Sequence, residues 1–126
     1  MAGIRQKDTS AERLVRKILS SLGLSFRVRN RDLPGSPDVA NRSRAWAVFV
    51  HGCFWHRHAA CPRSSTPKRN RAFWEEKFRQ NVARDRRAQA ALRKAGYRVV
   101  IVWECEVLRK PERVATRLER RLLKAT

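Results

Sequence analysis

The chain has 126 residues, enough for one domain with a single hydrophobic core and too few for two separate cores. It contains 30 Lys and Arg but only 11 Asp and Glu, and the net charge of +19 favours a polyanionic partner, nucleic acid or an anionic membrane, over the substrates of an ordinary metabolic enzyme. No apolar run approaches the roughly 20 residues of a membrane span. Residues 1–10 lack the hydrophobic region of a secretory signal, so we expect a cytoplasmic protein.

The N-terminal part of the chain predicts a helix followed by a strand. Residues 9–12 have the T-x-x-E form of a capping box, apolar residues recur at helical spacing as far as Leu22, and Gly23 supplies a left-handed stop. Residues 24–29 then alternate between apolar and polar side chains, which predicts a strand. Residues 33–37, rich in Pro and Gly, break the chain.

A hairpin is the next predicted unit. Residues 38–40 form a short strand, residues 45–50 form a strongly apolar one, and the four residues between them have turn chemistry. Residues 51–71 follow as an irregular loop, rich first in Cys and His and then in Ser, Pro and Arg. A loop this long in a small domain usually carries function.

A helix, a strand and a second helix complete the predicted order. Apolar residues at helical spacing predict a helix over residues 72–95, and Gly96 ends it. Residues 97–103 are nearly all apolar, as expected for a strand buried on both faces. Pro111 marks the start of the last helix. Taken together, one helix, three strands, a helix, a strand and a helix indicate an α/β fold.

Cysteine and histidine cluster in the loop after the hairpin. The spacing Cys53-x4-His58-x2-Cys61 offers three soft ligands, and a structural zinc site needs four in a tetrahedron. Cys105 can supply the fourth only if the end of the last predicted strand lies beside this loop. The alternative is three unrelated cysteines, one or two of them buried as small hydrophobic residues. The odd number of cysteines argues against a secreted disulfide framework.

Two histidines and two acidic residues are candidates for chemistry. His51 and His56 are left over from the metal cluster, which makes them candidates for proton transfer. Asp38 opens a strand after Pro37, where it can share Mg²⁺ with a group at the end of the next strand. The Pro-Asp pair fits the opening of the PD-(D/E)xK pattern of divalent-metal nucleases, but the Lys-bearing half of that pattern is absent. Glu12 is explained by the capping box alone; the alternative is that it points into the metal site.

Residues 49–58 resemble the F-x-H-G-C-F-W-H signature of the very-short-patch-repair (Vsr) DNA mismatch endonucleases. Five further pieces resemble motifs of that family in the same order: Asp8-Thr9-x2-Glu12, Leu33-Pro34-Gly35-Ser36-Pro37-Asp38, Phe73-Trp74-x2-Lys77, Asn81-Val82-x-Arg84-Asp85 and Val102-Trp103-Glu104-Cys105. The match runs from about Met1 to about Leu123, and the G-C-F-W-H core is its most specific part.

The resemblance implies a fold and an activity. The fold would be a PD-(D/E)xK-nuclease-like core, a small mixed sheet flanked by helices with a zinc-stapled loop, forming one domain over residues 1–126. The enzyme would recognise the T·G mismatch that deamination of 5-methylcytosine leaves in double-stranded DNA, and would nick the strand 5′ to the thymine. We expect a monomer, since nicking needs one active site. Its action at the nucleoid would be linked to mismatch-repair proteins and a cytosine-5 DNA methyltransferase.

The resemblance also assigns roles to single residues. Asp38 would ligate catalytic Mg²⁺ together with the backbone carbonyl of Val50. His56 would be the general base, supported by His51 and Glu12. Structural zinc would be held by four residues, Cys53, His58, Cys61 and Cys105. An aromatic wedge inserted beside the mismatch would consist of Phe54, Trp55 and Trp74.

The physics of a mismatch agrees with an aromatic wedge. A wobble pair stacks poorly, so opening it costs less than opening a matched step, where the cost is a few kcal/mol. Aromatic side chains replace lost base stacking at about 1–3 kcal/mol per base. The alternative for Phe54 and Trp55 is core packing. Two other functions stay open: a zinc-stabilised DNA-binding module that has lost turnover, and a restriction-type nuclease with a different site.

Overall fold

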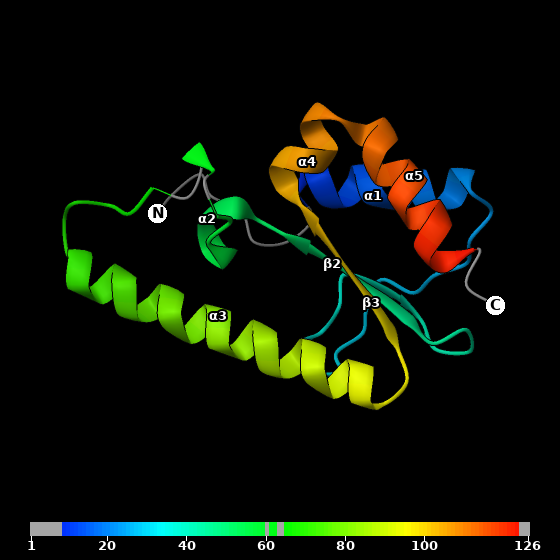
Figure 1. The fold of residues 1–126 in the computed structure, drawn as a ribbon, viewed down its shortest axis with the longest axis horizontal. Helices are drawn as coiled ribbons and strands as arrows, with labels where there is room; N and C mark the ends of the chain where they lie inside the picture. The colour runs from blue at the N-terminus through cyan, green and yellow to red at the C-terminus, as the bar shows by residue number, and fades with distance from the viewer. Residues whose placement is uncertain (1–8, 60, 63–64, 124–126) are drawn as a thin grey trace.

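The computed structural model describes residues 9–59, 61–62 and 65–123, which form a three-stranded sheet with helices on both faces (Figure 1). The elements are, in chain order, α1 (Ser10–Ser21), β1 (Val39–Asn41), β2 (Trp46–His51), α2 (Cys53–His56), α3 (Arg71–Lys94), β3 (Arg98–Trp103), α4 (Glu104–Arg109) and α5 (Pro111–Leu122). The predicted α/β class, with a small mixed sheet flanked by helices, is confirmed. None of the described helices is long and apolar enough to span a bilayer.

The sheet has the order β1-β2-β3 and combines both strand orientations. β1 and β2 form the predicted antiparallel hairpin. β3 runs parallel to β2, with Val50 opposite Val102 and His51 opposite Trp103. Because parallel strands end at the same edge of a sheet, the loop that follows β2 lies next to α4, which follows β3. This register places residues just after position 51 beside residues just after position 103.

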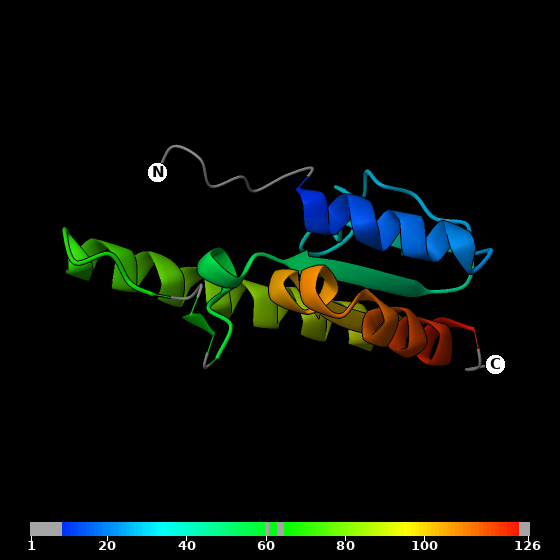
Figure 2. The same cartoon turned by 90° about the horizontal axis from the view of Figure 1, so that it is seen from above.

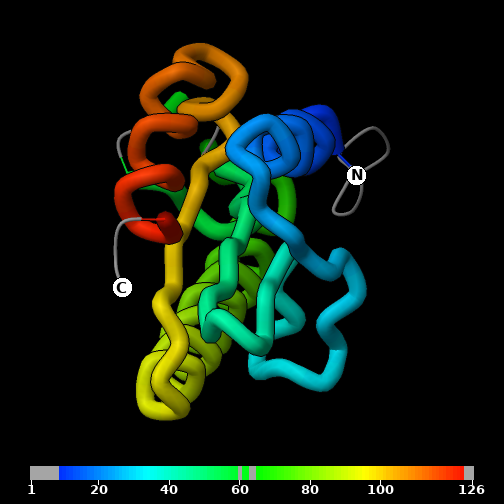
Figure 3. Tube along the Cα trace, turned by 90° about the vertical axis from the view of Figure 1, so that its right-hand side faces the viewer, coloured from blue at the N-terminus to red at the C-terminus, as the bar shows by residue number. Residues whose placement is uncertain are grey.

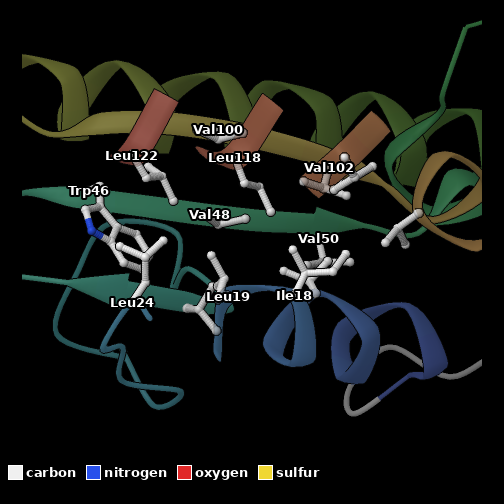
Figure 4. Packing of buried hydrophobic residues seen from close by; sticks show 14 of the residues in the cluster. Ile18, Leu19, Leu24, Trp46, Val48, Val50, Val100, Val102, Leu118 and Leu122 are labelled. Atoms are coloured by element: carbon white, nitrogen blue, oxygen red, sulfur yellow. The ribbon is translucent and has the colours of Figure 1, made fainter. Parts of the chain in front are cut away.

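Two apolar layers hold the helices against the sheet. α1 and α5 cover one face, where Leu19, Val48 and Leu118 are fully buried (Figure 4). On the other face Leu92 of α3 packs with Ala47. The N-terminal half of α3 extends past the sheet and runs beside α2 (Figure 1 and Figure 2). One end of α3 is therefore anchored in the core, and its other end is available to a functional site.

The open edge of the sheet is covered by two arginines of α5. β3 is an edge strand, and an unpaired strand edge invites another strand to pair with it. Arg117 donates a hydrogen bond to the carbonyl oxygen of Ile101, and Arg121 donates one to that of Val99, each at 3.2 Å. The two side chains are one helical turn apart and so match two carbonyls two residues apart along the strand.

The strand predicted over residues 24–29 is wrong. The segment runs beside β1 (Figure 3), but among the described residues it is joined to β1 only by an isolated bridge between Arg27 and Ala40 and by a hydrogen bond from the Asn41 side chain to the carbonyl oxygen of Ser25. The buried side chain of Asn30 donates hydrogen bonds to the carbonyl oxygens of Arg27 and Pro37, at 2.8 and 3.0 Å. These bonds hold the segment in a turn, and β1, with three residues, offers little edge to pair with.

Two short helices are absent from the sequence prediction. α2, of four residues, occupies the start of the loop expected to be irregular, and α4, of six, follows β3 directly. Neither is long enough for a hydrophobic period to show. The other predicted elements correspond to α1, the hairpin, α3, β3 and α5 within about two residues at each end, the usual uncertainty of a helix or strand boundary. Ile101 in β3 is half-buried, so the expected burial of that strand on both faces is incomplete.

Candidate active site

A cavity of 370 Å³ lies where β2 ends, between α1, α2 and α3. Glu12 enters it from the first turn of α1, Asp38 from the residue before β1, and His51 from the last position of β2. Its lining includes all four predicted catalytic residues and two residues to which the sequence assigned no role: Glu12, Asp38, His51, His56, Arg84 and Asp85.

Asp38 is a buried carboxylate with one strong backbone partner. Its Oδ2 accepts a hydrogen bond from the amide of Val50 at 2.6 Å, across the hairpin. Burial raises the pKa of Asp38 to about 7; the hydrogen bond from Val50 opposes this shift, and the nearby Glu12 carboxylate adds to it. Two acidic groups in one buried pocket favour a cation between them, and carboxylate and carbonyl oxygens are the donors that Mg²⁺ prefers. The donor set at this end of the hairpin therefore fits Mg²⁺.

His51 is buried against a second histidine. Its ring stacks on that of His56 with 3.9 Å between centroids and 6° between planes. Neither ring nitrogen of His51 has a hydrogen-bond partner among the described residues. Burial lowers the pKa of His51 to about 4, and the neighbouring His56 lowers it further. His51 is therefore a neutral imidazole at neutral pH, and its two ring nitrogens are shielded from solvent.

His56 is oriented by a carboxylate that the sequence did not single out. Its Nδ1 lies 2.6 Å from Oδ2 of Asp85, which projects from the middle of α3. A carboxylate accepts only, so Nδ1 carries the proton in this contact and Nε2 of a neutral ring is left as the acceptor. The sequence did hold a signal: Asn81 and Asp85 are four residues apart and so share one helix face. Asn81 bonds the carbonyl oxygen of Trp55 at 3.4 Å on that face.

The four predicted zinc ligands converge beside the cavity. Nδ1 of His58 lies 3.6 Å from Sγ of Cys53 and 3.3 Å from Sγ of Cys105, and the ligand atoms of all four residues, Cys61 included, lie within 4.8 Å of one another. Tetrahedral ligands at zinc bond lengths lie roughly 3.5 Å apart. None of the three cysteines forms a disulfide, and burial raises the pKa of Cys53 and of Cys105. A cation is what would favour their thiolates, so the cluster fits a bound metal.

Glu104 joins the Cys/His cluster to the cavity. It is the first residue of α4, it precedes Cys105, and it lines the cavity. Its Oε1 accepts a hydrogen bond at 3.3 Å from the amide of Cys53, one of the unpaired donors at the start of α2. This hydrogen bond joins the first residue of α4 to the first residue of α2, which the parallel pairing of β2 and β3 brings close together.

The three predicted wedge residues form one aromatic cluster between α2 and α3. Ring centroids of Phe54 lie 5.1 Å from Trp55 and 5.8 Å from Trp74, and the two tryptophans are 6.1 Å apart. All three are half-buried, and none belongs to either apolar layer of the sheet. Phe78 is buried beneath them, and Trp55 also lines the cavity. The aromatic cluster therefore adjoins the predicted catalytic residues and stays apart from the core.

Similarity to known proteins agrees with this geometry. A family model described as DNA mismatch endonuclease Vsr matches residues 1–63. The type II nicking enzyme V.XorIIP of Xanthomonas oryzae pv. oryzae is 46% identical over 107 residues, which cover 85% of this chain and 78% of that protein. The DNA mismatch endonuclease Vsr of Escherichia coli (strain K12) is 43% identical over 105 residues, 83% of this chain and 67% of that protein.

A third relative extends the pattern. The type II nicking enzyme V.NmeAIP of Neisseria meningitidis serogroup A is 40% identical over 110 residues, 87% of this chain and 78% of that protein. Family model and relatives overlap in the segment that holds the hairpin, α2 and the start of the Cys/His cluster. The chain belongs to the DNA mismatch endonuclease Vsr family and is a strand-nicking DNA endonuclease.

Proposed function

We propose that the chain is a Mg²⁺-dependent endonuclease that nicks double-stranded DNA 5′ to the thymine of a T·G mismatch. The observation that carries this proposal is the pocket in which Asp38, the His56–Asp85 pair and Trp55 meet. One domain over residues 1–126, acting as a monomer, suffices for a single cut. Such an enzyme repairs the product of 5-methylcytosine deamination, so its work follows that of a cytosine-5 DNA methyltransferase and adjoins that of mismatch-repair proteins.

His56 is the proposed general base. With Nδ1 bound to Asp85, its Nε2 accepts the proton of the attacking water, and the Asp85 carboxylate stabilises the imidazolium that results. A positioned general base contributes typically 10²–10⁴-fold. His51, neutral and stacked on the same ring, limits its rotation.

Asp38 and the backbone carbonyl of Val50 are the proposed Mg²⁺ ligands, supported by Glu12. A bound divalent ion supplies charge stabilisation at the phosphoryl oxygens and lowers the pKa of coordinated water. The hairpin contact between Asp38 and the Val50 amide fixes the carboxylate in place before the ion arrives. This arrangement at the start of β1 supports the relation to the PD-(D/E)xK nucleases.

The Cys/His cluster is proposed to hold one structural zinc ion. Its ligands are Cys53, His58, Cys61 and Cys105, with their atoms within 4.8 Å of one another. Protein side chains would supply all four zinc ligands, which is typical of structural rather than catalytic zinc. The site ties the loop after α2 to α4 and so steadies the segment that carries His56.

Phe54, Trp55 and Trp74 are the proposed wedge. Each is half-buried in the protein and so presents part of its ring surface to a ligand. Inserted beside a T·G pair, these rings replace the stacking that opening the step removes, worth about 1–3 kcal/mol per base. Trp55 and His56 are consecutive residues of α2, so insertion of the wedge and approach of the scissile phosphate to the base are one movement.

A single-turnover nicking assay tests the proposal. Duplexes of one sequence with T·G, T·A or C·G at the central pair are incubated with excess enzyme, with and without Mg²⁺. We expect a nick 5′ to the thymine of T·G alone, and only with Mg²⁺. Equal nicking of T·A and T·G contradicts mismatch recognition, and nicking at one matched sequence favours the restriction-type alternative.

A further inference from the structure

α2 carries two of the three proposed wedge residues and the proposed base, but it is too short to be stable as an isolated helix. α2 has four residues, Cys53–His56, and a helix of one turn is unstable by itself because nucleation fixes several residues for few hydrogen bonds. The position of Phe54, Trp55 and His56 therefore depends on contacts from outside α2. Glu104 supplies one at its N-terminal end through the Cys53 amide.

At the C-terminal end of α2, Arg57 adds contacts to those that Asn81 and Asp85 make with Trp55 and His56. Its Nη1 donates hydrogen bonds to the carbonyl oxygens of Phe54 and Ser65, at 3.1 and 3.4 Å, and its Nη2 donates one to Oγ1 of Thr66 at 2.9 Å. The Phe54 carbonyl belongs to the last turn, where helical partners are missing and a cation is favourable. The guanidinium of Arg57 thus joins α2 to loop residues that lie eight and nine positions further along the chain.

The guanidinium of Arg57 also stacks on the buried ring beneath the aromatic cluster. Its central carbon is 3.9 Å from the ring centroid of Phe78 in α3. Phe78 in turn contacts Phe54, with 5.2 Å between centroids and rings at 90°, and Trp74, with 5.7 Å and 28°. Arg57 therefore touches both the backbone of the wedge helix and the ring on which two of the three wedge residues rest.

We propose that Arg57 is a positioning residue for mismatch discrimination, which holds the aromatic wedge in its inserting geometry without contacting DNA. The inference rests on the proposed mismatch function and goes beyond it, because Arg57 lies outside the catalytic cavity and outside the wedge. It adjoins a separate cleft of 350 Å³ on the α3 surface, which Arg86 also lines.

Geometry rather than charge is what this position requires. A guanidinium is planar, so it stacks on Phe78 while two of its nitrogens reach three oxygens in different directions; an ammonium is a single point charge on a flexible stem. The backbone conformation also indicates that these contacts matter at position 57. Arg57 has φ +57°, in the left-handed region that favours glycine. A non-glycine residue persists there where surrounding contacts compensate for the strain.

Two substitutions separate geometry from charge. Arg57→Lys keeps the positive charge and loses the planar fork. Arg57→Gly removes the side chain and relieves the backbone strain, so it adds no conflict of its own. The matched control is Arg86→Gln, which removes one charge from the same cleft: Arg86 is exposed and makes no side-chain hydrogen bond or ion pair within the described residues. Trp55→Ala serves as the reference for a damaged wedge.

Four quantities are measured for each protein: single-turnover nicking of T·G and T·A duplexes, affinity for matched DNA at several salt concentrations, melting temperature, and bound zinc. For both Arg57 variants we expect T·G nicking to fall by about tenfold to 10²-fold, the effect of reacting groups displaced by an ångström. Matched-DNA affinity, its salt dependence, melting temperature and zinc content should stay at the wild-type values. Arg86→Gln should keep wild-type selectivity.

Five results overturn the inference. Wild-type selectivity in Arg57→Lys would show that charge suffices. Equal loss of affinity for both duplexes, with a salt slope smaller by about 1, would make Arg57 a phosphate contact. A large fall in melting temperature or lost zinc in Arg57→Gly would make its role structural. If wild-type protein does not discriminate T·G from T·A, the proposed function fails as well; if Trp55→Ala loses selectivity and the Arg57 variants keep it, the inference fails alone.

Discussion

His56 has two neighbours that act on its ring in different ways. Asp85 binds Nδ1 at 2.6 Å and so sets the tautomer and the orientation. His51 stacks on the ring face at 3.9 Å and contributes no charge, because burial holds its pKa near 4. In its proposed role as a base, His56 would need one neighbour that stabilises the imidazolium and one that is uncharged, and Asp85 and His51 would divide these tasks.

Asp85→Asn separates the orienting role from simple packing. An amide is close to isosteric with the carboxylate but can donate to Nδ1, which favours the wrong tautomer of His56. We expect single-turnover nicking of T·G DNA to fall by about 10²–10⁴-fold, the weight of a general base, with DNA affinity nearly unchanged. Asp32→Asn is the matched control, since that exposed carboxylate binds only Arg27 and Arg42 among the described residues. Nicking at the wild-type rate in Asp85→Asn would contradict the assignment.

The raised pKa of Asp38 predicts competition between protons and Mg²⁺. With a pKa of about 7 in the metal-free protein, the carboxyl group is mostly neutral below that pH and ionised above it. A metal ligand must be ionised, so nicking at low Mg²⁺ should rise with pH through about 7, and the midpoint should move to lower pH as Mg²⁺ is increased. Rate–pH profiles at two Mg²⁺ concentrations measure the shift, and a midpoint independent of Mg²⁺ rules out Asp38 as the ligand.

Some residues of the site are visible in sequence and others only in space. Asp38, His51 and His56 stand in short motifs, so their types and spacing indicate chemistry before any fold is known. Asp85 lies within a motif, but its partner is 29 positions away and a helix face has to meet a loop before the pair exists. Arg57 falls within the matched segment, residues 49–58, but comes after the last letter of the signature; in sequence it is one of 30 basic residues, and its contacts with the wedge exist only when α2, α3 and the loop are assembled.

At the scale of elements, periodicity predicts the long ones and fails for the short ones. α1, α3 and α5 present apolar residues over three turns or more, and the hairpin has turn chemistry between two apolar runs. α2 and α4 have one turn each and are stabilised by groups from other elements, such as Glu104 at the start of α2. The strand wrongly predicted over residues 24–29 shows the converse: alternation is present, but Asn30 binds the backbone in a turn.

Loss of one distant zinc ligand should release the loop after α2. Cys105→Ala removes the ligand that β3 and α4 supply, so the purified variant should lose the approximately one zinc per chain expected of wild type, and its melting temperature should fall. Lys68→Ala, an exposed substitution in the same loop, is the control and should keep the metal. Elemental analysis and thermal unfolding measure both. Wild-type protein purified without zinc would contradict the prediction.

Trp55→Ala should lose discrimination and little stability. Trp55 is half-buried and lies outside both apolar layers of the sheet, so its truncation should lower the melting temperature only slightly. The preference for T·G over T·A should fall towards unity, because the ring that replaces lost stacking is gone. Trp46→Ala, at a fully buried core position, is the contrasting control and should cost about 3–5 kcal/mol of stability. A Trp55→Ala protein that is strongly destabilised but still selective would place Trp55 in packing and move the wedge role to Trp74.

At the scale of the whole molecule, shape and charge serve different parts of recognition. The sheet and its two apolar layers fix where the cavity and aromatic cluster lie, through the β2–β3 register and the long reach of α3. Of the net charge of +19, the helices carry +8, with +5 of it on α3, and the rest of the chain carries +11. Phosphates repeat along any duplex, so this charge would bind DNA without regard to sequence, while the proposed wedge would respond only to a step that opens.

This division predicts how affinity and selectivity respond to salt. If about six to eight phosphates are contacted, log K for either duplex should fall with log salt at a slope of roughly −5 to −7, because each neutralised phosphate releases condensed counterions. The ratio of the T·G and T·A affinities should stay nearly constant over the same range, since stacking on uncharged rings releases no ions. Fluorescence anisotropy with both duplexes, in Ca²⁺ in place of Mg²⁺ to prevent nicking, measures the two slopes together. A selectivity ratio that falls steeply with salt would mean that cationic side chains, rather than the aromatic cluster, read the mismatch. A slope near zero for both duplexes would mean that the net charge of +19 has a purpose other than DNA binding.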